Sequence, residues 1–259
     1  MTKRCRNKAN NFDTRVKNGT YPAEGIKQVI NAVQSGSVEC LKWAADIGSG
    51  TRFFSWPKYN KFCGCLYAAI FSYGAQGRTQ AVEQLDLKEF QKCWTSNIPI
   101  TSTKFKTKMK YGKQIVTIPE GIAKQMMTAY NDRVRPAARA CLLQGGIMIP
   151  SSKYIRFVVY LSTHFLLLFV LSHHVDEKLF LSKSGKHLRL SRYLLNFFIK
   201  SANLKLTVTT LRKMVETEIK LGRLNQVITA NESVEVNMTL GHSRRTSDST
   251  YVLNTTEMR

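Results

Sequence analysis

A histidine and a tyrosine near the end of the sequence are of the types needed for chemistry on a phosphate group. His242 follows Gly241, and Tyr251 comes after a short polar run. Gly241 favours the left-handed position that ends a helix, and Thr246 or Ser247 could cap a new helix carrying Tyr251. A phenol with a pKa of about 10 is a poor nucleophile at neutral pH. It becomes useful beside cationic donors, so this chemistry requires basic residues from elsewhere in the chain.

The same stretch resembles the C-terminal box of the tyrosine recombinases, the phage-integrase family. The matching residues are Leu240, Gly241, His242, Ser243 and Tyr251. The resemblance makes Tyr251 the nucleophile and His242 a donor to the phosphoryl group. Arg244 and Arg245 lie between them and are expected to contact DNA.

An arginine follows a helical pattern and a glycine break earlier in the chain. Lys61–Tyr73 is rich in aromatic and small apolar residues and is followed by Gly74-Ala-Gln-Gly77 and then Arg78. This order resembles the first arginine box of the recombinases, particularly the Gln-Arg-Pro-Gly-Ala-Val form of eukaryotic Crypton-like elements. The resemblance makes Arg78 the first catalytic arginine. The alternative is a surface arginine after a helix.

A lysine-rich hairpin is predicted between Ser102 and Pro119, because two extended runs flank Tyr111-Gly112-Lys113. Alternate residues of a strand share a face, so one face carries Lys104, Lys106, Lys108 and Lys110. That face suits a DNA backbone, or it is a solvated edge that discourages aggregation. The resemblance places the family's hairpin lysine at Lys106, as general acid, with Lys104 and Lys108 as competitors.

A second arginine lies in a predicted helix within Leu204–Leu221. This segment resembles the family's His-x-x-Arg helix start, with Arg212 as the second catalytic arginine. The histidine position is occupied by Thr209. A hydroxyl can bond a phosphate oxygen and cap the helix, but it cannot titrate near neutral pH.

The resemblance implies a reaction on DNA without metal or cofactor. Tyr251 would attack a phosphodiester and form a 3′-phosphotyrosyl intermediate, while Lys106 protonates the leaving 5′ oxygen. Arg78 and Arg212 would hold the non-bridging oxygens as bidentate forks and neutralise charge that other nucleases handle with magnesium. Recombinases of this family act as tetramers on double-stranded DNA.

The overall charge independently favours a polyanionic partner. The 259 residues contain 39 Lys and Arg against 17 Asp and Glu, a formal net charge of +22. Nucleic acid is the simplest partner, with a membrane surface or an acidic protein as alternatives. Six cysteines show no disulfide or zinc framework and are interpreted as reduced thiols of an intracellular protein.

We expect an α+β fold: a mainly helical tyrosine-recombinase catalytic domain with a small antiparallel sheet carrying Lys106. The predicted domains are a basic N-terminal arm or truncated remnant, residues 1–38, and the catalytic domain, residues 39–259. Further helices are expected at Ala23–Val33, Ser191–Lys200 and Ile122–Arg135, the last ending near Pro136. Residues 155–171 are strongly apolar but interrupted by polar side chains, so a membrane helix is disfavoured against an insertion around 150–175.

Two further functions stay open beside a site-specific recombinase or integrase of a mobile element. Thr209 and the short N-terminal region favour a domesticated or decayed DNA-binding protein of the same fold. A tyrosine topoisomerase shares the chemistry. The Crypton-like resemblance implies a eukaryotic nucleus.

Overall fold

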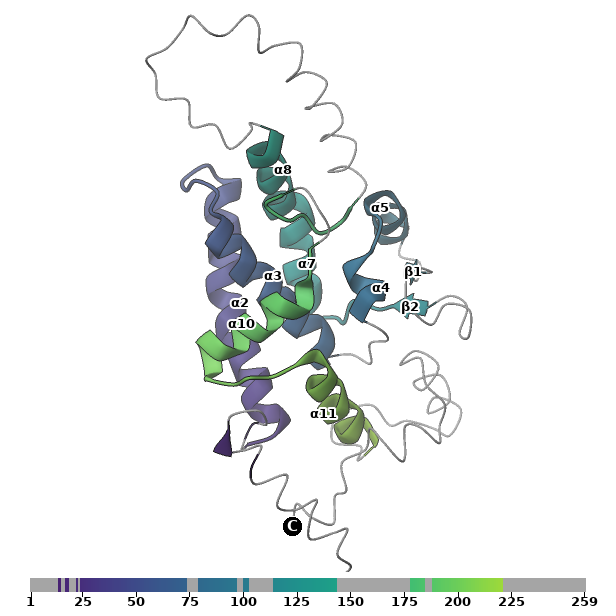
Figure 1. The fold of residues 1–259 in the computed structure, drawn as a ribbon. Coiled ribbons are helices and arrows are strands. Elements are labelled where there is room, and N and C mark those ends of the chain that lie inside the picture. The colour runs from purple at the N-terminus through teal and green to yellow at the C-terminus, as the bar shows by residue number, and fades with distance from the viewer. Residues whose placement is uncertain are drawn as a thin grey trace, which may run out of the picture.

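The computed structural model describes residues 14, 17–18, 22, 24–73, 79–96, 100–102, 114–143, 178–184 and 188–220. These residues form a mainly helical fold with two short strands, which confirms the predicted helical character (Figure 1). In chain order the elements are α2 (Ile26–Gly48), α3 (Trp56–Tyr73), α4 (Thr79–Glu83), α5 (Leu87–Thr95), β1 (Ile100–Ser102), β2 (Gln114–Val116), α7 (Ile122–Ala129), η1 (Tyr130–Val134), α8 (Arg135–Leu143), α10 (Leu190–Ala202) and α11 (Val208–Lys220).

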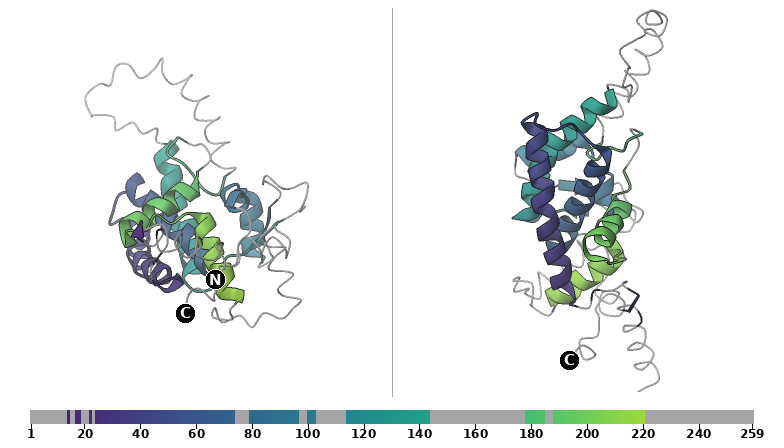
Figure 2. Two further views of the ribbon diagram at one scale, coloured as in Figure 1. Left: turned by 60° about the horizontal axis from the view of Figure 1, so that its bottom comes forward. Right: turned by 90° about the vertical axis from the view of Figure 1, so that its left-hand side faces the viewer.

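Helices α2 and α3 form a long helical hairpin, and α7, α10 and α11 pack against both of its helices (Figures 1 and 2). The predicted helix at Ala23–Val33 is the first part of α2, which continues to Gly48 because buried positions recur along its whole length. They are Ile26, Val29, Ala32, Val33, Gly36, Ser37, Cys40, Trp43 and Ala44. The boundary predicted between residues 38 and 39 therefore falls inside one helix.

Helix α3 is the central element, and one run of it is buried on every side. Residues 62–72 of this helix are all buried, including Phe62, Tyr67 and Phe71. A helix without a polar face must be covered all round. Helices α2, α7, α10 and α11 supply that cover.

The helix predicted to end near Pro136 instead continues through it, which corrects the sequence interpretation. The π-helical turn η1 lies just before the proline, and the Arg135 amide donates to the carbonyl of Tyr130, five residues back. Proline has no amide hydrogen and its ring would clash with the carbonyl four residues earlier in a regular helix. The wider turn accommodates the proline, so α8 runs on to Leu143.

The two strands pair antiparallel, as a hairpin requires. Ile100 lies opposite Val116 and Ser102 opposite Gln114. Residues 103–113 between them, which contain the predicted lysine face, lie outside the described residues. The apolar stretch 155–171 also lies outside them, and no helix in the described ranges is long and apolar enough to cross a membrane.

Helix α10 crosses α2 and α3 at very short range because two glycines face it (Figure 1). A Cβ atom placed on Gly64 of α3 would lie 2.4 Å from the carbonyl oxygen of Tyr193. A Cβ on Gly36 of α2 would lie 2.6 Å from the ring of Phe197. Real Cβ atoms do not approach other atoms this closely, so a larger residue at Gly64 would displace the backbone of α10 and one at Gly36 would displace the Phe197 ring.

Gly64→Ala is expected to lower the free energy of unfolding by about 2 kcal/mol or more, since α10 must move away from α3. Gly48→Ala is the matched control, because its Cβ would meet only the flexible side chain of Arg133 at 3.0 Å. Both changes gain helix propensity, so only the backbone contact differs. Urea unfolding of the two variants measures this, and equal stabilities would contradict the tight approach of α10.

Candidate DNA-binding and catalytic site

Of the predicted site residues, the structure describes Arg212 and Thr209, both in α11. Arg212 lies on the buried face of the helix with Leu211 and Val215, and is 8% exposed. Thr209, one turn earlier, is exposed. A guanidinium is costly to bury without compensating partners, so Arg212 differs from an ordinary surface arginine.

The cap of α11 is Thr207, which corrects the suggestion that Thr209 caps this helix. The Thr207 hydroxyl oxygen accepts a hydrogen bond from the amide of Thr210 at 3.2 Å, and the two hydroxyl groups lie 3.0 Å apart. This is the side-chain bond of an N-cap residue. Thr209 therefore lies inside the first turn with its side chain exposed.

The other predicted site residues lie outside the described ranges. They are Arg78, Lys104, Lys106, Lys108, Lys110, His242, Arg244, Arg245 and Tyr251. Some elements next to them in sequence are described. Helix α4 begins at Thr79, directly after Arg78, and contacts β2 beyond the lysine segment, while α11 packs on α3. Convergence of the full set stays a prediction.

A buried polar network, which sequence analysis missed, holds the extended segment Lys178–Leu181 against the helices. The Tyr130 hydroxyl donates to the carbonyl of Leu179 at 2.9 Å and lies 3.0 Å from the Tyr59 hydroxyl. The amide of Leu181 donates to the Tyr59 oxygen at 3.1 Å. The two hydroxyls thus join α3 and η1 to a segment far away in sequence.

Arg135 completes this network from the start of α8. Its Nε donates to the carbonyl of Leu179 at 3.1 Å and its Nη2 donates to the carbonyl of Lys178 at 2.9 Å. Arg135 is 6% exposed, whereas Arg133 is exposed. Arg135 therefore supports the fold by holding the backbone of this segment.

The tyrosines of this network are structural hydrogen-bonding groups. Burial raises the pKa of Tyr59 well above its ordinary value, and burial also raises the pKa of Tyr130. A raised pKa makes the phenolate form harder to reach, so neither tyrosine is suited to act as a nucleophile at neutral pH. Both side chains are fully buried, so no substrate can reach them in this fold.

Glu83 links the end of α4 to the start of α10. Its Oε1 accepts a hydrogen bond from the Ser191 amide at 2.9 Å, and Glu83 is 7% exposed. A carboxylate at a helix N-terminus is favoured by the orphan amide groups and the helix dipole. The short helix after Arg78 is thereby fixed to α10.

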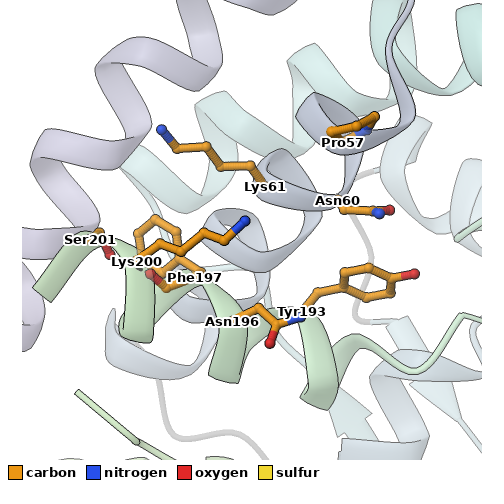
Figure 3. A pocket seen from close by; sticks show the side chains of 8 residues that line it. All are labelled: Pro57, Asn60, Lys61, Tyr193, Asn196, Phe197, Lys200 and Ser201. Carbon is orange, nitrogen blue, oxygen red and sulfur yellow. Dashed lines mark hydrogen bonds between the residues drawn. The ribbon is translucent and has the colours of Figure 1, made fainter. Parts of the chain in front are cut away.

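A pocket of about 290 Å³ lies between the start of α3 and the second half of α10 (Figure 3). The helices supply Lys61 and Lys200, with Asn60, Asn196 and Tyr193 close by. Sequence analysis did not single out these residues, because no motif marks them. The feature that marks the site is a pair of lysines from two helices that are distant in sequence, and it is visible in the folded chain but not in the sequence.

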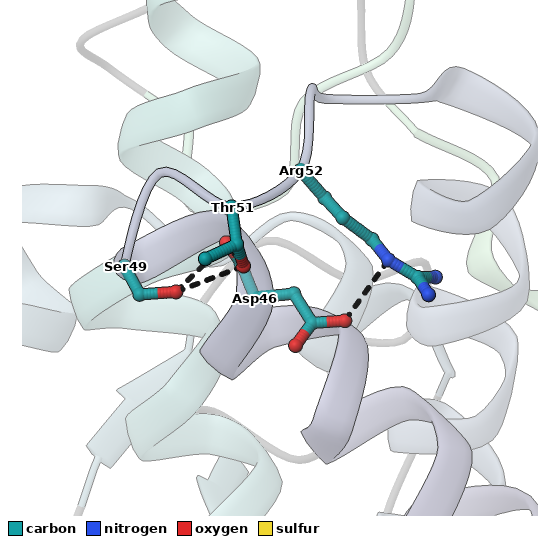
Figure 4. A network of polar contacts seen from close by, with 4 residues as sticks. All are labelled: Asp46, Ser49, Thr51 and Arg52. Carbon is teal, nitrogen blue, oxygen red and sulfur yellow. Dashed lines mark hydrogen bonds and ion pairs between the residues drawn. The ribbon is translucent and has the colours of Figure 1, made fainter.

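A second pocket of about 220 Å³ adjoins the turn between α2 and α3. The carbonyl of Asp46 accepts from the Ser49 hydroxyl at 3.1 Å and from the Thr51 hydroxyl at 3.0 Å (Figure 4). The Asp46 carboxylate pairs with Arg52 at 3.1 Å. These bonds close the end of α2 and fix the wall of the pocket.

No protein-family model, curated protein or solved structure matches this chain.

Thr207→Ala is expected to lower the free energy of unfolding by about 1 kcal/mol, because the amide of Thr210 loses its partner. Thr209→Ala removes an exposed hydroxyl from the same turn and should change stability by less than about 0.5 kcal/mol. Urea unfolding of both variants measures the difference. A larger effect at Thr209 would contradict the assignment of Thr207 as the cap.

Arg135→Met is expected to lower the free energy of unfolding by about 2–4 kcal/mol, since two buried hydrogen bonds from a charged group are lost. Arg133→Met, two positions away on the exposed side, removes the same charge and should cost far less. Chemical denaturation compares the two. Equal losses would show that net charge rather than the anchoring of Lys178–Leu181 sets the effect.

Proposed function

We propose that this protein binds double-stranded DNA and is a site-specific recombinase or integrase of the tyrosine type. The observation that carries the proposal is the order of the motifs: Arg78, the lysine hairpin with Lys106, Arg212, and then His242 with Tyr251. A net charge of +22 supports a DNA partner. Helix α11 begins at Val208 and carries both Thr209 and Arg212, which supports the helix start that the resemblance expects at these residues.

The proposed reaction is a transesterification at one phosphodiester. The Tyr251 oxygen gives up its proton to solvent as it attacks the phosphorus atom, and its bond to phosphorus replaces the bond to the 5′ oxygen of the next nucleotide. Lys106 transfers a proton to that leaving oxygen, which departs as a 5′-hydroxyl. A 5′-hydroxyl of another strand then attacks the phosphotyrosyl bond, restores the phosphodiester and releases Tyr251.

The cationic residues have separate tasks in this reaction. Arg78 and Arg212 bind the non-bridging oxygens through paired donors, and His242 donates to the same phosphoryl group. Lys104, Lys108 and Lys110 contact the DNA backbone beside Lys106. Arg244 and Arg245 contact phosphates next to Tyr251, while Thr209 bonds a phosphate oxygen.

The mainly helical fold supports a recombinase catalytic domain of the α+β class, with the hairpin between β1 and β2 carrying the general acid. Action on double-stranded DNA as a homotetramer, and a place in the nucleus, belong to the same proposal. The tetramer follows from the resemblance to the recombinase family, and the nuclear location follows from the resemblance to Crypton-like elements.

A second function has a specific observation in its favour. Thr209 stands where the family has a histidine, and its side chain is exposed on the first turn of α11. A threonine hydroxyl does not titrate near neutral pH and cannot replace histidine as an acid or base. The second candidate is therefore a DNA-binding protein of the same fold that has lost catalysis.

The wild-type protein is expected to form a covalent adduct with a nicked suicide duplex, and Tyr251→Phe is expected to abolish the adduct while retaining DNA binding. The reason is that phenylalanine lacks the nucleophilic oxygen but leaves the cationic groups in place. Denaturing gels measure the adduct and mobility shift measures binding. Duplexes drawn from the flanks of the element that encodes the protein supply the sites.

Tyr21→Phe is the control, because Tyr21 lies outside the region that resembles the recombinases. An adduct that survives in Tyr251→Phe excludes Tyr251 as the nucleophile. Salt-sensitive binding by the wild type without any adduct selects the non-catalytic DNA-binding protein. Relaxation of supercoiled plasmid at no specific site selects a topoisomerase.

A further inference from the structure

The pocket between α3 and α10 has a charged end and an uncharged end. The side chains of Lys61 and Lys200 lie toward one end, and Tyr193, Asn60 and Pro57 lie toward the other (Figure 3). Phe197 lines the pocket and is 3% exposed, so its ring is part of the core. The lining therefore offers positive charge, amide groups and an aromatic ring within one cavity.

The shape of this pocket follows from the close approach of α10. Gly64 allows the backbone of Tyr193 to lie against α3, and Gly36 leaves room for the ring of Phe197. Both lysines project from helices that are held by these contacts. The spacing between the two ammonium-bearing helices is thus fixed by backbone packing and does not depend on a loop.

The neighbouring pocket extends the positive charge. Lys61 lines both pockets, and the second is also lined by Lys42 and Lys58, while its acidic residues Glu39 and Asp46 pair with Lys61 and Arg52. The Lys61–Glu39 pair, at 2.6 Å, is partly exposed on both sides, and such pairs contribute little stability. Lys61 can therefore turn to a phosphate without leaving a buried charge unpaired.

We infer that the pocket between α3 and α10 binds a nucleotide unit, with its phosphate between Lys61 and Lys200 and its base against Tyr193, Asn60 and Asn196. Lysine ammonium groups bind phosphate as point charges. Amide side chains can both donate to and accept from a base edge, and an aromatic ring supplies a stacking surface. A cavity of about 290 Å³ is just below the usual volume range of small-ligand sites, which begins at about 300 Å³.

This site is independent of the proposed strand exchange. None of its lining residues belongs to the predicted catalytic set. The nucleotide unit has two sources, a free nucleotide or an unpaired nucleotide of a DNA strand. In the second case the next phosphate along the strand would reach the adjoining pocket at Lys42 and Lys58.

Calorimetric titration of the full chain with 5′-AMP, adenosine, inorganic phosphate and a tetra-deoxyadenylate strand tests the inference. We expect 5′-AMP to bind saturably and more tightly than adenosine or phosphate alone.

Lys61→Gln combined with Lys200→Gln should weaken 5′-AMP binding about tenfold or more. Tyr193→Ala should weaken 5′-AMP but leave phosphate binding unchanged. Thermal unfolding checks that the variants stay folded, which is expected because both lysines are partly or fully exposed.

Lys124→Gln is the matched control for the general charge of the protein. Lys124 is ion-paired with Glu120 at 2.6 Å and lies on α7, outside the pocket. If Lys124→Gln together with Lys27→Gln weakens 5′-AMP as much as the pocket variants do, the binding is non-specific and the inference fails. It also fails if 5′-AMP does not saturate, or if a glutamate decapeptide displaces it as well as the tetranucleotide does.

The two sources give different supporting results. Tetra-deoxyadenylate that binds more tightly than 5′-AMP, and is weakened further by Lys58→Gln, identifies a strand nucleotide. Equal affinities that are unaffected by Lys58→Gln identify a free nucleotide. Either result can coexist with a negative covalent-trapping assay, so failure of the proposed recombination chemistry is distinguishable from failure of this site.

Discussion

The anchoring of the extended segment Lys178–Leu181 by buried polar side chains is the interaction on which the rest of the arrangement depends. Tyr59, Tyr130 and Arg135 bond its backbone from α3, η1 and α8, and the Leu179 amide also donates to the Leu85 carbonyl at 3.1 Å. A buried peptide group without a hydrogen-bond partner would be costly. These side chains bond the backbone groups of the segment, as a neighbouring strand would in a sheet. The chain that follows, α10 and then α11 with Arg212, starts from this fixed point.

The second constraint is the close approach of α10 to the central hairpin of α2 and α3. At Gly36 and Gly64 the helices approach until atoms of α10 occupy the space of a Cβ. Glu83 then holds the first turn of α10 through the Ser191 amide. Together these contacts connect the short helix after Arg78, the central helix α3 and the helix that leads to α11. They also form the walls of the pocket that carries Lys61 and Lys200.

Sequence analysis predicted the helices well where the apolar pattern was strong, and less well where tertiary contacts decided. The helix at Ser191–Lys200 is α10, Leu190–Ala202, and the helix containing Arg212 is α11. Pro136 was interpreted as a helix end because a proline usually is one, whereas a π-turn at Tyr130–Val134 carries the helix past it. Thr209 was proposed as a cap because its residue type fits, but Thr207 makes the bond.

The sequence by itself determined the basic charge, the order of the motifs from Arg78 to Tyr251 and the helical pattern, since these depend on residue types and local spacing. Only the tertiary structure decided which arginines are buried, and that Arg135 serves the fold. It also decided that Lys61 and Lys200 share a pocket. Burial and contacts between distant helices depend on how closely the backbones approach each other, and that distance cannot be read from local residue patterns.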